Sequence, residues 1–162
     1  MEIIVIAHNI RSTHNIGAIL RTCDGFGVIK VYCTGYTPYP TLPGDKRLPH
    51  LRDKITKHIH KTALGAEASV PIEQADEVQT ILDSLKTDGF QLIALEQDPK
   101  SVALPKVHLP QKIALLLGEE VNGIPPNILA QCDTIIEIPM RGTKESFNVS
   151  VAAGIALYAL SI

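Results

Sequence analysis

Short runs of apolar, often β-branched residues alternate with segments of helical periodicity along nearly the whole chain of 162 residues. The first run, at 2–7, predicts a buried strand, and the segment NIGAILRTCDGFG predicts a helix that begins near Asn15 and ends at its glycines. A second strand is predicted at 28–33, which completes a β-α-β unit. Because parallel neighbours need such crossovers, the alternation predicts an α/β fold with a mostly parallel sheet and flanking helices.

The same alternation continues downstream of a Gly/Pro-rich connection at 34–45, which we expect to be irregular and to act as a lid or a substrate-facing loop. Further strands are predicted at 68–73, 90–96, 112–118 and 134–140, and further helices at 46–62, 75–89, 125–132 and 147–160. At roughly 150 residues per domain, residues 1–162 are expected to form one domain. Ligands of such folds bind at the carboxyl ends of the strands.

Charge and cysteine usage exclude several classes of protein. Fifteen Lys and Arg against 17 Asp and Glu give a net charge of −2, so the chain lacks the global basic character of many nucleic-acid binders, although a local basic face remains open. The three scattered cysteines argue against a disulfide framework and fit a reducing cytoplasm. Neither a metal site nor a membrane span is expected: His58 and His60 would point to different helix faces, and the apolar stretch at 149–162 is shorter than the roughly 20 residues that a span needs.

The usual nucleotide-binding and hydrolase motifs of α/β enzymes are missing. The turn after the first strand reads AHNIRSTHNIG, without GxGxxG, and neither GxxxxGK[ST] nor GxSxG occurs in the chain. An α/β enzyme that binds another nucleotide through a phosphate loop is one functional hypothesis for this chain, and the absence of such a loop argues against it.

Glycine and polar residues gather instead in three stretches: HNIGAILRTCDGFGV, LLLGEEVNGIP and IEIPMRGTKESFNVSVAAGIALYAL. In this order they closely resemble the three motifs of the SpoU (TrmH-like) family of RNA 2′-O-ribose methyltransferases, which use S-adenosylmethionine and belong to the SPOUT superfamily. The resemblance runs from about residue 10 to the end of the chain. It implies the fold, cofactor, partners and site residues given below.

In the first stretch, the resemblance implies that Arg21 is catalytic and that Asn15 helps to hold the active site. Taken alone, Asn15 is typical of a helix cap and Arg21 of a solvated helical charge; the three motifs together favour the catalytic interpretation. Because a guanidinium has a pKa above about 12, we expect Arg21 to clamp a substrate phosphate and to stabilise the developing alkoxide rather than to act as a base.

The second stretch matches the family pattern G-x-E-x-x-G at 118–123, which places the family's glutamate at Glu120. Glycines at a strand end let the backbone approach a ligand, and the carboxylate of Glu120 is suited to orient Arg21. Glu120 and the RNA phosphate are the two candidates for receiving the 2′-hydroxyl proton. By itself, this stretch would be no more than a glycine-rich turn with two exposed acids.

The third stretch is the most specific, although Phe147 stands where family members usually carry leucine. The resemblance implies a cofactor site formed by Leu95 or Glu96, Gly118, Ile138, Met140, Ser146, Asn148 and Val149. Ser146 and Asn148 are also expected to shape the cofactor loop and to position the nucleophile, the alternative being that each caps the last helix.

The resemblance further implies a deep trefoil knot in the C-terminal part, with a β-α-β part at about 1–88 and a knotted, cofactor-binding part at about 89–162. It also implies a homodimer through the C-terminal helix, whose many small residues suit close packing. From composition alone, an ordinary core helix is the alternative for this segment.

A basic segment at 46–61 is predicted either to meet the RNA backbone or to form an ordinary solvated helix. RNA contacts are expected at Arg11, Arg21, Lys46, Arg47, Arg52 and Lys54. We expect transfer RNA as the substrate, because the single-domain length is similar to that of compact family members that modify it. A ribosomal RNA methyltransferase and a non-catalytic RNA-binding or ribosome-associated protein on the same fold are the alternatives.

Overall fold

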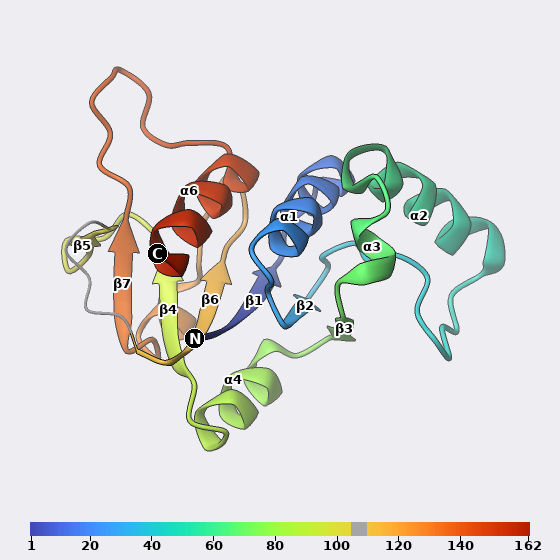
Figure 1. Cartoon of the computed structure of the whole chain (residues 1–162), viewed down its shortest axis with the longest axis horizontal. Coiled ribbons are helices and arrows are strands. Elements are labelled where there is room, and N and C mark those ends of the chain that lie inside the picture. The colour runs from blue at the N-terminus through green and yellow to red at the C-terminus, as the bar shows by residue number, and fades with distance from the viewer. Residues whose placement is uncertain (105–109) are drawn as a thin grey trace.

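A computed structural model, which describes residues 1–104 and 110–162, shows one sheet of seven parallel strands covered by helices (Figure 1). The strands are β1 (Glu2–His8), β2 (Lys30–Thr34), β3 (Ile72–Ala75), β4 (Gln91–Leu95), β5 (Val102–Ala103), β6 (Lys112–Leu117) and β7 (Thr134–Glu137). Their order across the sheet is β3-β2-β1-β6-β4-β7-β5, and every pair is parallel. This architecture confirms the predicted α/β class.

Six helices occur in the described part of the chain: α1 (Thr13–Gly25), α2 (Pro49–Ala63), α3 (Ala66–Ser69), α4 (Val78–Thr87), α5 (Pro126–Leu129) and α6 (Val149–Ser161). In Figure 1, α1 and α6 lie side by side over one face of the sheet, α2 and α3 adjoin α1, and α4 lies on the opposite side. Within residues 1–104 and 110–162, no helix combines the length and the apolar character that crossing a membrane requires.

Both faces of the sheet are buried, which explains the continuous apolar runs of its strands. Along β1, Ile3 and Val5 pack into the core layer beneath α1 and α6, whereas Ile4 and Ile6 pack into the layer beneath α4. Because successive side chains of a strand point to opposite faces of the sheet, β1 contributes to the hydrophobic core on each face.

Several predicted boundaries were wrong in informative ways. The segment at 68–73 does not form one strand, because α3 occupies Ala66–Ser69 and the strand begins only at Ile72. The last helix begins at Val149 rather than at 147, because Asn148 is its N-cap. The helix predicted at 125–132 spans only Pro126–Leu129, and the two-residue strand β5 was not predicted.

The strand order interleaves distant parts of the chain, since β6 lies between β1 and β4, and β7 lies between β4 and β5. This order is compatible with the deep trefoil knot, which stays a prediction. The division at residues 88 and 89 also stays a prediction, and the sheet itself continues across that point through the pairing of β4 with β6 and of β6 with β1.

Candidate functional site

A hollow of about 540 Å³ lies at the carboxyl ends of β4, β6 and β7. Its floor comes from the three strand ends, and the segment that leads into α6 forms a further wall. The residues that line it are Leu95, Glu96, Gln97, Leu117, Gly118, Glu119, Glu120, Val121, Gly123, Glu137, Ile138, Glu145, Ser146, Phe147, Asn148, Val149 and Ala152. The hollow therefore lies where ligands of parallel sheets bind.

Most residues predicted to hold a cofactor meet in this hollow. Leu95, Gly118, Ile138, Ser146, Asn148 and Val149 all line it, and so does Glu96, the alternative to Leu95. Met140 is not among the lining residues. Segments that lie far apart in sequence are thus brought together at one end of the sheet.

Gly118 lies where the backbone that follows β6 folds closely over the strand end. A Cβ at this position would lie 2.6 Å from the carbonyl carbon of Gly123 and 2.7 Å from the backbone nitrogen of Ile124. Backbone atoms cannot move aside as a flexible side chain can, so only glycine fits here. The Glu96 carboxylate holds the same turn by accepting a 2.9 Å hydrogen bond from the backbone N–H of Ile124.

A chain of hydrogen bonds links one residue from each of the three sequence motifs at the rim of the hollow. The side-chain amide of Asn15 donates to Glu120 Oε1 at 3.0 Å. Asn15 Oδ1 in turn accepts from the side-chain amide of Asn148 at 3.2 Å. Asn148 Oδ1 then accepts from the backbone N–H of Ser150 at 2.9 Å and from its hydroxyl at 2.6 Å.

This chain of hydrogen bonds from Glu120 through Asn15 and Asn148 to Ser150 is called the relay below. Its two end groups determine how both amides point. An ionised carboxylate only accepts hydrogen bonds, so Asn15 must turn its NH₂ group toward Glu120 and its oxygen toward Asn148. The backbone N–H of Ser150 only donates, so Asn148 must turn its oxygen toward Ser150 and its NH₂ group toward Asn15. Each asparagine is therefore held in a single orientation.

Glu120 also receives the backbone N–H groups at the start of α1. Its Oε2 accepts from Arg11 N at 3.1 Å and its Oε1 accepts from Ser12 N at 3.3 Å. Burial alone would raise the pKa of Glu120, but the hydrogen bonds from Asn15 and from these two N–H groups outweigh burial and lower it. Glu120 is thus ionised at neutral pH and ties the loop after β1 to the loop after β6.

The expected contact between Glu120 and Arg21 is wrong, because the Glu120 carboxylate is hydrogen-bonded to Asn15 and to the backbone of residues 11 and 12. Arg21 lies six residues after Asn15, which at about 100° per residue places it about 120° around α1. Its side chain is exposed, and it makes neither a hydrogen bond nor an ion pair with the described residues. The Arg21 guanidinium is therefore available to a ligand.

Asn148 both caps the last helix and takes part in the contacts at the site. It is the N-cap of α6, and the same side chain takes part in the relay through its other amide atom. Ser146 lines the hollow but does not cap the helix.

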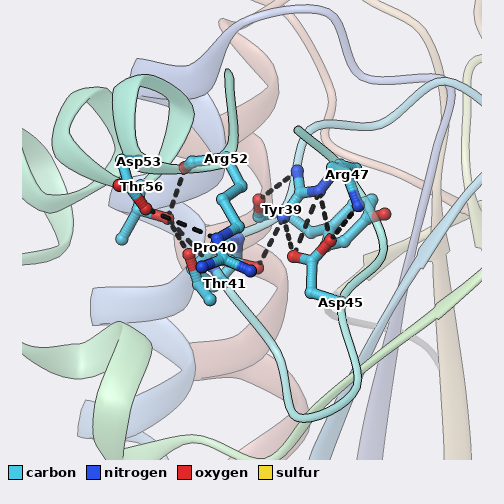
Figure 2. Close-up of polar contacts among 8 residues, drawn as sticks. All are labelled: Tyr39, Pro40, Thr41, Asp45, Arg47, Arg52, Asp53 and Thr56. Atoms are coloured by element: carbon cyan, nitrogen blue, oxygen red, sulfur yellow. Dashed lines mark hydrogen bonds and ion pairs between the residues drawn. The ribbon is translucent and has the colours of Figure 1, made fainter. Parts of the chain in front are cut away.

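The basic segment divides into internal and exposed cations. Arg47 lies with its guanidinium carbon 3.6 Å from the ring centroid of Tyr39, pairs with Asp45 at 2.5 Å and donates to the carbonyl oxygens of Tyr39 and Pro40 (Figure 2). The hydrogen bonds from Arg47 hold the pKa of Asp45 far below its usual value. This geometry explains Arg47 as a residue that stabilises the loop, and RNA contact by Arg47 stays a prediction.

The other predicted RNA-binding residues differ in exposure. Lys46 and Lys54 are exposed, whereas Arg52 is half-buried on α2, with its Nε 3.6 Å from Asp53 (Figure 2). Arg11 is exposed and pairs with Glu119 at 2.6 Å. Their contacts with RNA stay predictions.

Several residues that line the hollow were not among the predicted site residues, and two of them make polar contacts there. Gln97 donates through its side-chain amide to the carbonyl oxygen of Glu145 at 2.6 Å, which joins the end of β4 to the segment before α6. Glu119 lines the hollow and carries the ion pair to Arg11. No motif marks Gln97, and only its position two residues beyond a strand end could have indicated it.

Among the described residues, no group of three or more His, Cys, Asp or Glu side chains is placed to hold a metal ion.

Comparison with protein families gives a match over most of the chain. The SpoU rRNA Methylase family matches residues 46–158. A tRNA (guanosine(18)-2′-O)-methyltransferase from Aquifex aeolicus is 37% identical over 158 residues, which cover 97% of this chain and 67% of that protein. A 23S rRNA (guanosine-2′-O-)-methyltransferase from Coxiella burnetii is 30% identical over 156 residues, which cover 96% of this chain and 56% of that protein.

A solved structure shows the same fold. The AdoMet-bound rRNA methyltransferase from Sinorhizobium meliloti superimposes with a TM-score of 0.82 at 24% identity, covering 98% of this chain and 55% of that protein. The chain thus spans about half to two thirds of the length of these proteins.

Proposed function

The chain belongs to the SpoU methylase family, and we propose that it transfers a methyl group from S-adenosylmethionine to a ribose 2′-hydroxyl of RNA. The observation that carries this proposal is the relay from Glu120 through Asn15 to Asn148 beside the hollow. It joins the three motifs of the family in a single hydrogen-bonded unit. A non-catalytic protein on the same fold would have no need to hold these side chains in one orientation.

The hollow suits S-adenosylmethionine in size and in charge. Its volume of about 540 Å³ lies within the range of small-molecule sites, roughly 300–1,000 Å³. Five carboxylates line it, and their field favours a cationic sulfonium over the anionic phosphates of ATP. They belong to Glu96, Glu119, Glu120, Glu137 and Glu145.

Backbone and apolar groups complete the proposed cofactor site. The close turn at Gly118 brings backbone donors and acceptors to the floor, and Leu95, Ile138 and Val149 supply apolar walls for an adenine ring. When bound, S-adenosylmethionine supplies the electrophilic methyl group.

The residues of this chain then position the RNA and respond to charge at the reacting oxygen. Arg21, with no partner among the described residues, binds a substrate phosphate and stabilises the developing alkoxide. Glu120 is assigned to holding Asn15, since its pKa is lowered and its oxygens already accept three hydrogen bonds. Asn148 fixes the start of α6 against Asn15 at the wall of the site.

Transfer RNA is the proposed substrate, and ribosomal RNA is the alternative. The 37% identity to a tRNA methyltransferase supports the first, and the 30% identity to an rRNA methyltransferase supports the second. Because the chain spans only part of the length of these relatives, the choice between them needs an assay with both RNAs.

A homodimer through α6 is also proposed. Val151, Ile155, Tyr158 and Ile162 are exposed at successive spacings of four, three and four residues, which places them on one face of the helix. Tyr158 and Ile162 are 58% and 80% exposed, and a second copy of this chain would cover them. RNA contacts would then combine surfaces of both subunits. Sedimentation that shows a fully active monomer would remove this part of the proposal.

The proposed function is tested first by calorimetric titration with S-adenosylmethionine and S-adenosylhomocysteine. We expect saturable binding of both, loss of binding in the Gly118→Ala variant and no binding of ATP. Methyl transfer to undermodified transfer and ribosomal RNAs then identifies the substrate. Folded, dimeric protein that binds the cofactor neither alone nor with RNA present would contradict the proposed function and favour a non-catalytic RNA-binding protein.

A further inference from the structure

An exposed aromatic ring lies two residues beyond the end of β2, where the carboxyl ends of the strands meet. Tyr36 is 52% exposed and does not belong to either hydrophobic core. By contrast, Tyr39, three residues later, packs against the core and stacks on Arg47. Tyr36 therefore places a large π surface in solvent, outside both cores.

The backbone under Tyr36 is firmly held. Its N–H donates to the side-chain oxygen of Asn9 at 3.1 Å. Gly35, with φ of +63°, makes the turn that brings this N–H to Asn9, and a Cβ on Gly35 would lie only 1.9 Å from Asn9 Oδ1. The ring is thus presented from a rigid base.

Asn9, which accepts from Tyr36, also contacts the buried His8. The hydrogen-bond partners of His8 determine its tautomer. Because Asn9 Oδ1 accepts from Tyr36, the NH₂ group of Asn9 lies toward His8 Nε2, at 3.3 Å. Nε2 must then accept, which leaves the proton on His8 Nδ1, 2.9 Å from the hydroxyl of Thr34. Burial lowers the pKa of His8, which agrees with this neutral form.

Arg11 connects the ring to the candidate site. Its guanidinium carbon lies 5.9 Å from the centroid of the Tyr36 ring, and its Nη2 lies 2.6 Å from Oε1 of Glu119. Its backbone N–H donates to Glu120 at 3.1 Å. Both glutamates line the hollow, so Arg11 contacts its rim and Tyr36 lies beside Arg11.

An exposed aromatic ring next to an arginine is the combination with which proteins hold single-stranded RNA. Unstacked bases pack on aromatic faces, and an adjacent guanidinium contacts phosphate or stacks on the base. A ribose must also be accessible for its 2′-hydroxyl to react, so the bases beside it are available for such stacking.

We propose that Tyr36 and Arg11 form a nucleobase-stacking subsite, in which an RNA base beside the methylated nucleotide packs on the exposed face of Tyr36 and Arg11 binds the neighbouring phosphate. This subsite deepens the proposed function and rests on it. It assigns the loop after β2 a role in selecting nucleotides in single-stranded or looped RNA.

The chain contains no tryptophan, which makes a direct binding test possible. The Tyr36→Trp variant carries a single indole at the subsite, and its fluorescence is titrated with undermodified tRNA and with a short single-stranded oligoribonucleotide. We expect saturable quenching with the same Kd as filter binding gives. The matched control is Tyr32→Trp, because Tyr32 lies on the preceding strand with Lys30 Nζ 5.4 Å from its ring centroid. Its fluorescence should not respond.

Kinetics of conservative variants separate stacking from structural support. Tyr36→Phe keeps the π face and should keep the wild-type KM for RNA, whereas Tyr36→Leu should raise that KM about tenfold or more while cofactor binding stays unchanged. Arg11→Ala should raise the same KM and weaken its salt dependence. Thermal melting shows whether each variant is folded, and Tyr36→Trp provides an answer even if Tyr36→Leu is unstable.

Three results would overturn the subsite: RNA binding without quenching of the indole in the Tyr36→Trp variant, equal losses in the Phe and Leu variants, or no RNA binding by the wild-type protein. Quenching is measured without methyl transfer, so the subsite and the proposed function fail separately. RNA-dependent quenching in a protein that transfers no methyl group would support the subsite alone. Methyl transfer without quenching would support the function alone.

Discussion

The side-chain amide of Asn148 donates a 3.2 Å hydrogen bond to the side-chain oxygen of Asn15, which lies 133 positions earlier in the chain. Asn15 stands near the start of α1 and Asn148 caps α6, so this contact joins the starts of the two helices beside the hollow that Asn148 lines. The bond therefore links the first and third motifs directly, while packing in the core holds the two helices together.

Replacement of Asn148 separates its two roles. Asn148→Ala removes the cap, which should lower the unfolding free energy by about 1 kcal/mol and the Tm by about 2–4 °C. We expect a larger effect on kcat, a fall of about 100-fold or more, because Asn15 loses the partner that orients it. Asn148→Ser is the matched control, since serine caps as well as asparagine but cannot extend an amide to Asn15. It should restore the Tm and leave kcat low; recovery of both would show that Asn148 acts only as a cap.

Protonation of Glu120 should weaken the fold in acid. Because its folded-state pKa is lowered from 4.5, the stabilisation by its hydrogen bonds is complete above that value and disappears as the pH falls through the lowered pKa. Urea unfolding should therefore show a difference between wild type and Glu120→Gln that is larger at pH 6 than at pH 3. Glu77→Gln, at an exposed position before α4, is the control. An equal difference at both pH values would contradict the assignment.

Gly118 should tolerate no side chain. A methyl group there would meet backbone atoms of residues 123 and 124 at 2.6–2.7 Å, so Gly118→Ala should lower the unfolding free energy by about 1–3 kcal/mol. Cofactor binding, measured by calorimetry, should fall with it. Gly25→Ala is the matched control, because nothing lies within 4 Å of a Cβ at that position. A Gly118→Ala protein that binds the cofactor normally would exclude the backbone at this turn from the site.

Arg21 should matter for the reaction and not for the fold. Its guanidinium makes no hydrogen bond or ion pair with the described residues, so Arg21→Ala should leave the Tm and the cofactor Kd unchanged. Single-turnover methyl transfer should fall about 100-fold or more, and Arg21→Lys should recover only part of it, since lysine lacks the planar fork. Full single-turnover activity in a folded Arg21→Ala protein would remove Arg21 from the mechanism.

Two cations of the basic segment should respond in opposite ways. Lys54 is exposed, so Lys54→Ala should weaken RNA binding and reduce the slope of log affinity against log salt by about 0.7–0.9, the value for one neutralised phosphate. Arg47 is held by Asp45, Tyr39 and Pro40, so Arg47→Ala should lower the Tm. Filter binding at several salt concentrations, together with melting curves, checks both. An unchanged salt slope for Lys54→Ala would indicate that α2 is an ordinary solvated helix.

Much of the fold follows from local sequence signals. Apolar β-branched runs located β1, β2, β4, β6 and β7 to within a few residues, because buried parallel strands need no polar face. The one-turn helix α3 and the two-residue strand β5 were not predicted, since elements so short carry no periodicity. Their conformation is set by neighbours that the local sequence does not specify.

Part of the candidate site could be predicted from the sequence, but the hydrogen bonds between its residues could not. The resemblance to a known family brought Asn15, Glu120 and Asn148 together, and the structure joins them in one relay. The partner of Glu120 was wrongly predicted as Arg21, because a carboxylate and a guanidinium attract in any sequence-based argument. The actual donors include the backbone N–H groups of residues 11 and 12, which no side-chain pattern can reveal.

The all-parallel sheet also determines how the chain must fold. Even the least distant of its strand pairings joins residues 22 positions apart, Gln91 with Ile113, and the pairing of β1 with β6 joins residues 110 positions apart, Glu2 with Lys112. Loop closure must therefore precede every contact between strands of the sheet, which places the chain among slow-folding topologies of high contact order. A partly collapsed chain contains local helices without a sheet edge to receive the cofactor, so binding competence should emerge late in refolding, together with the last cooperative step.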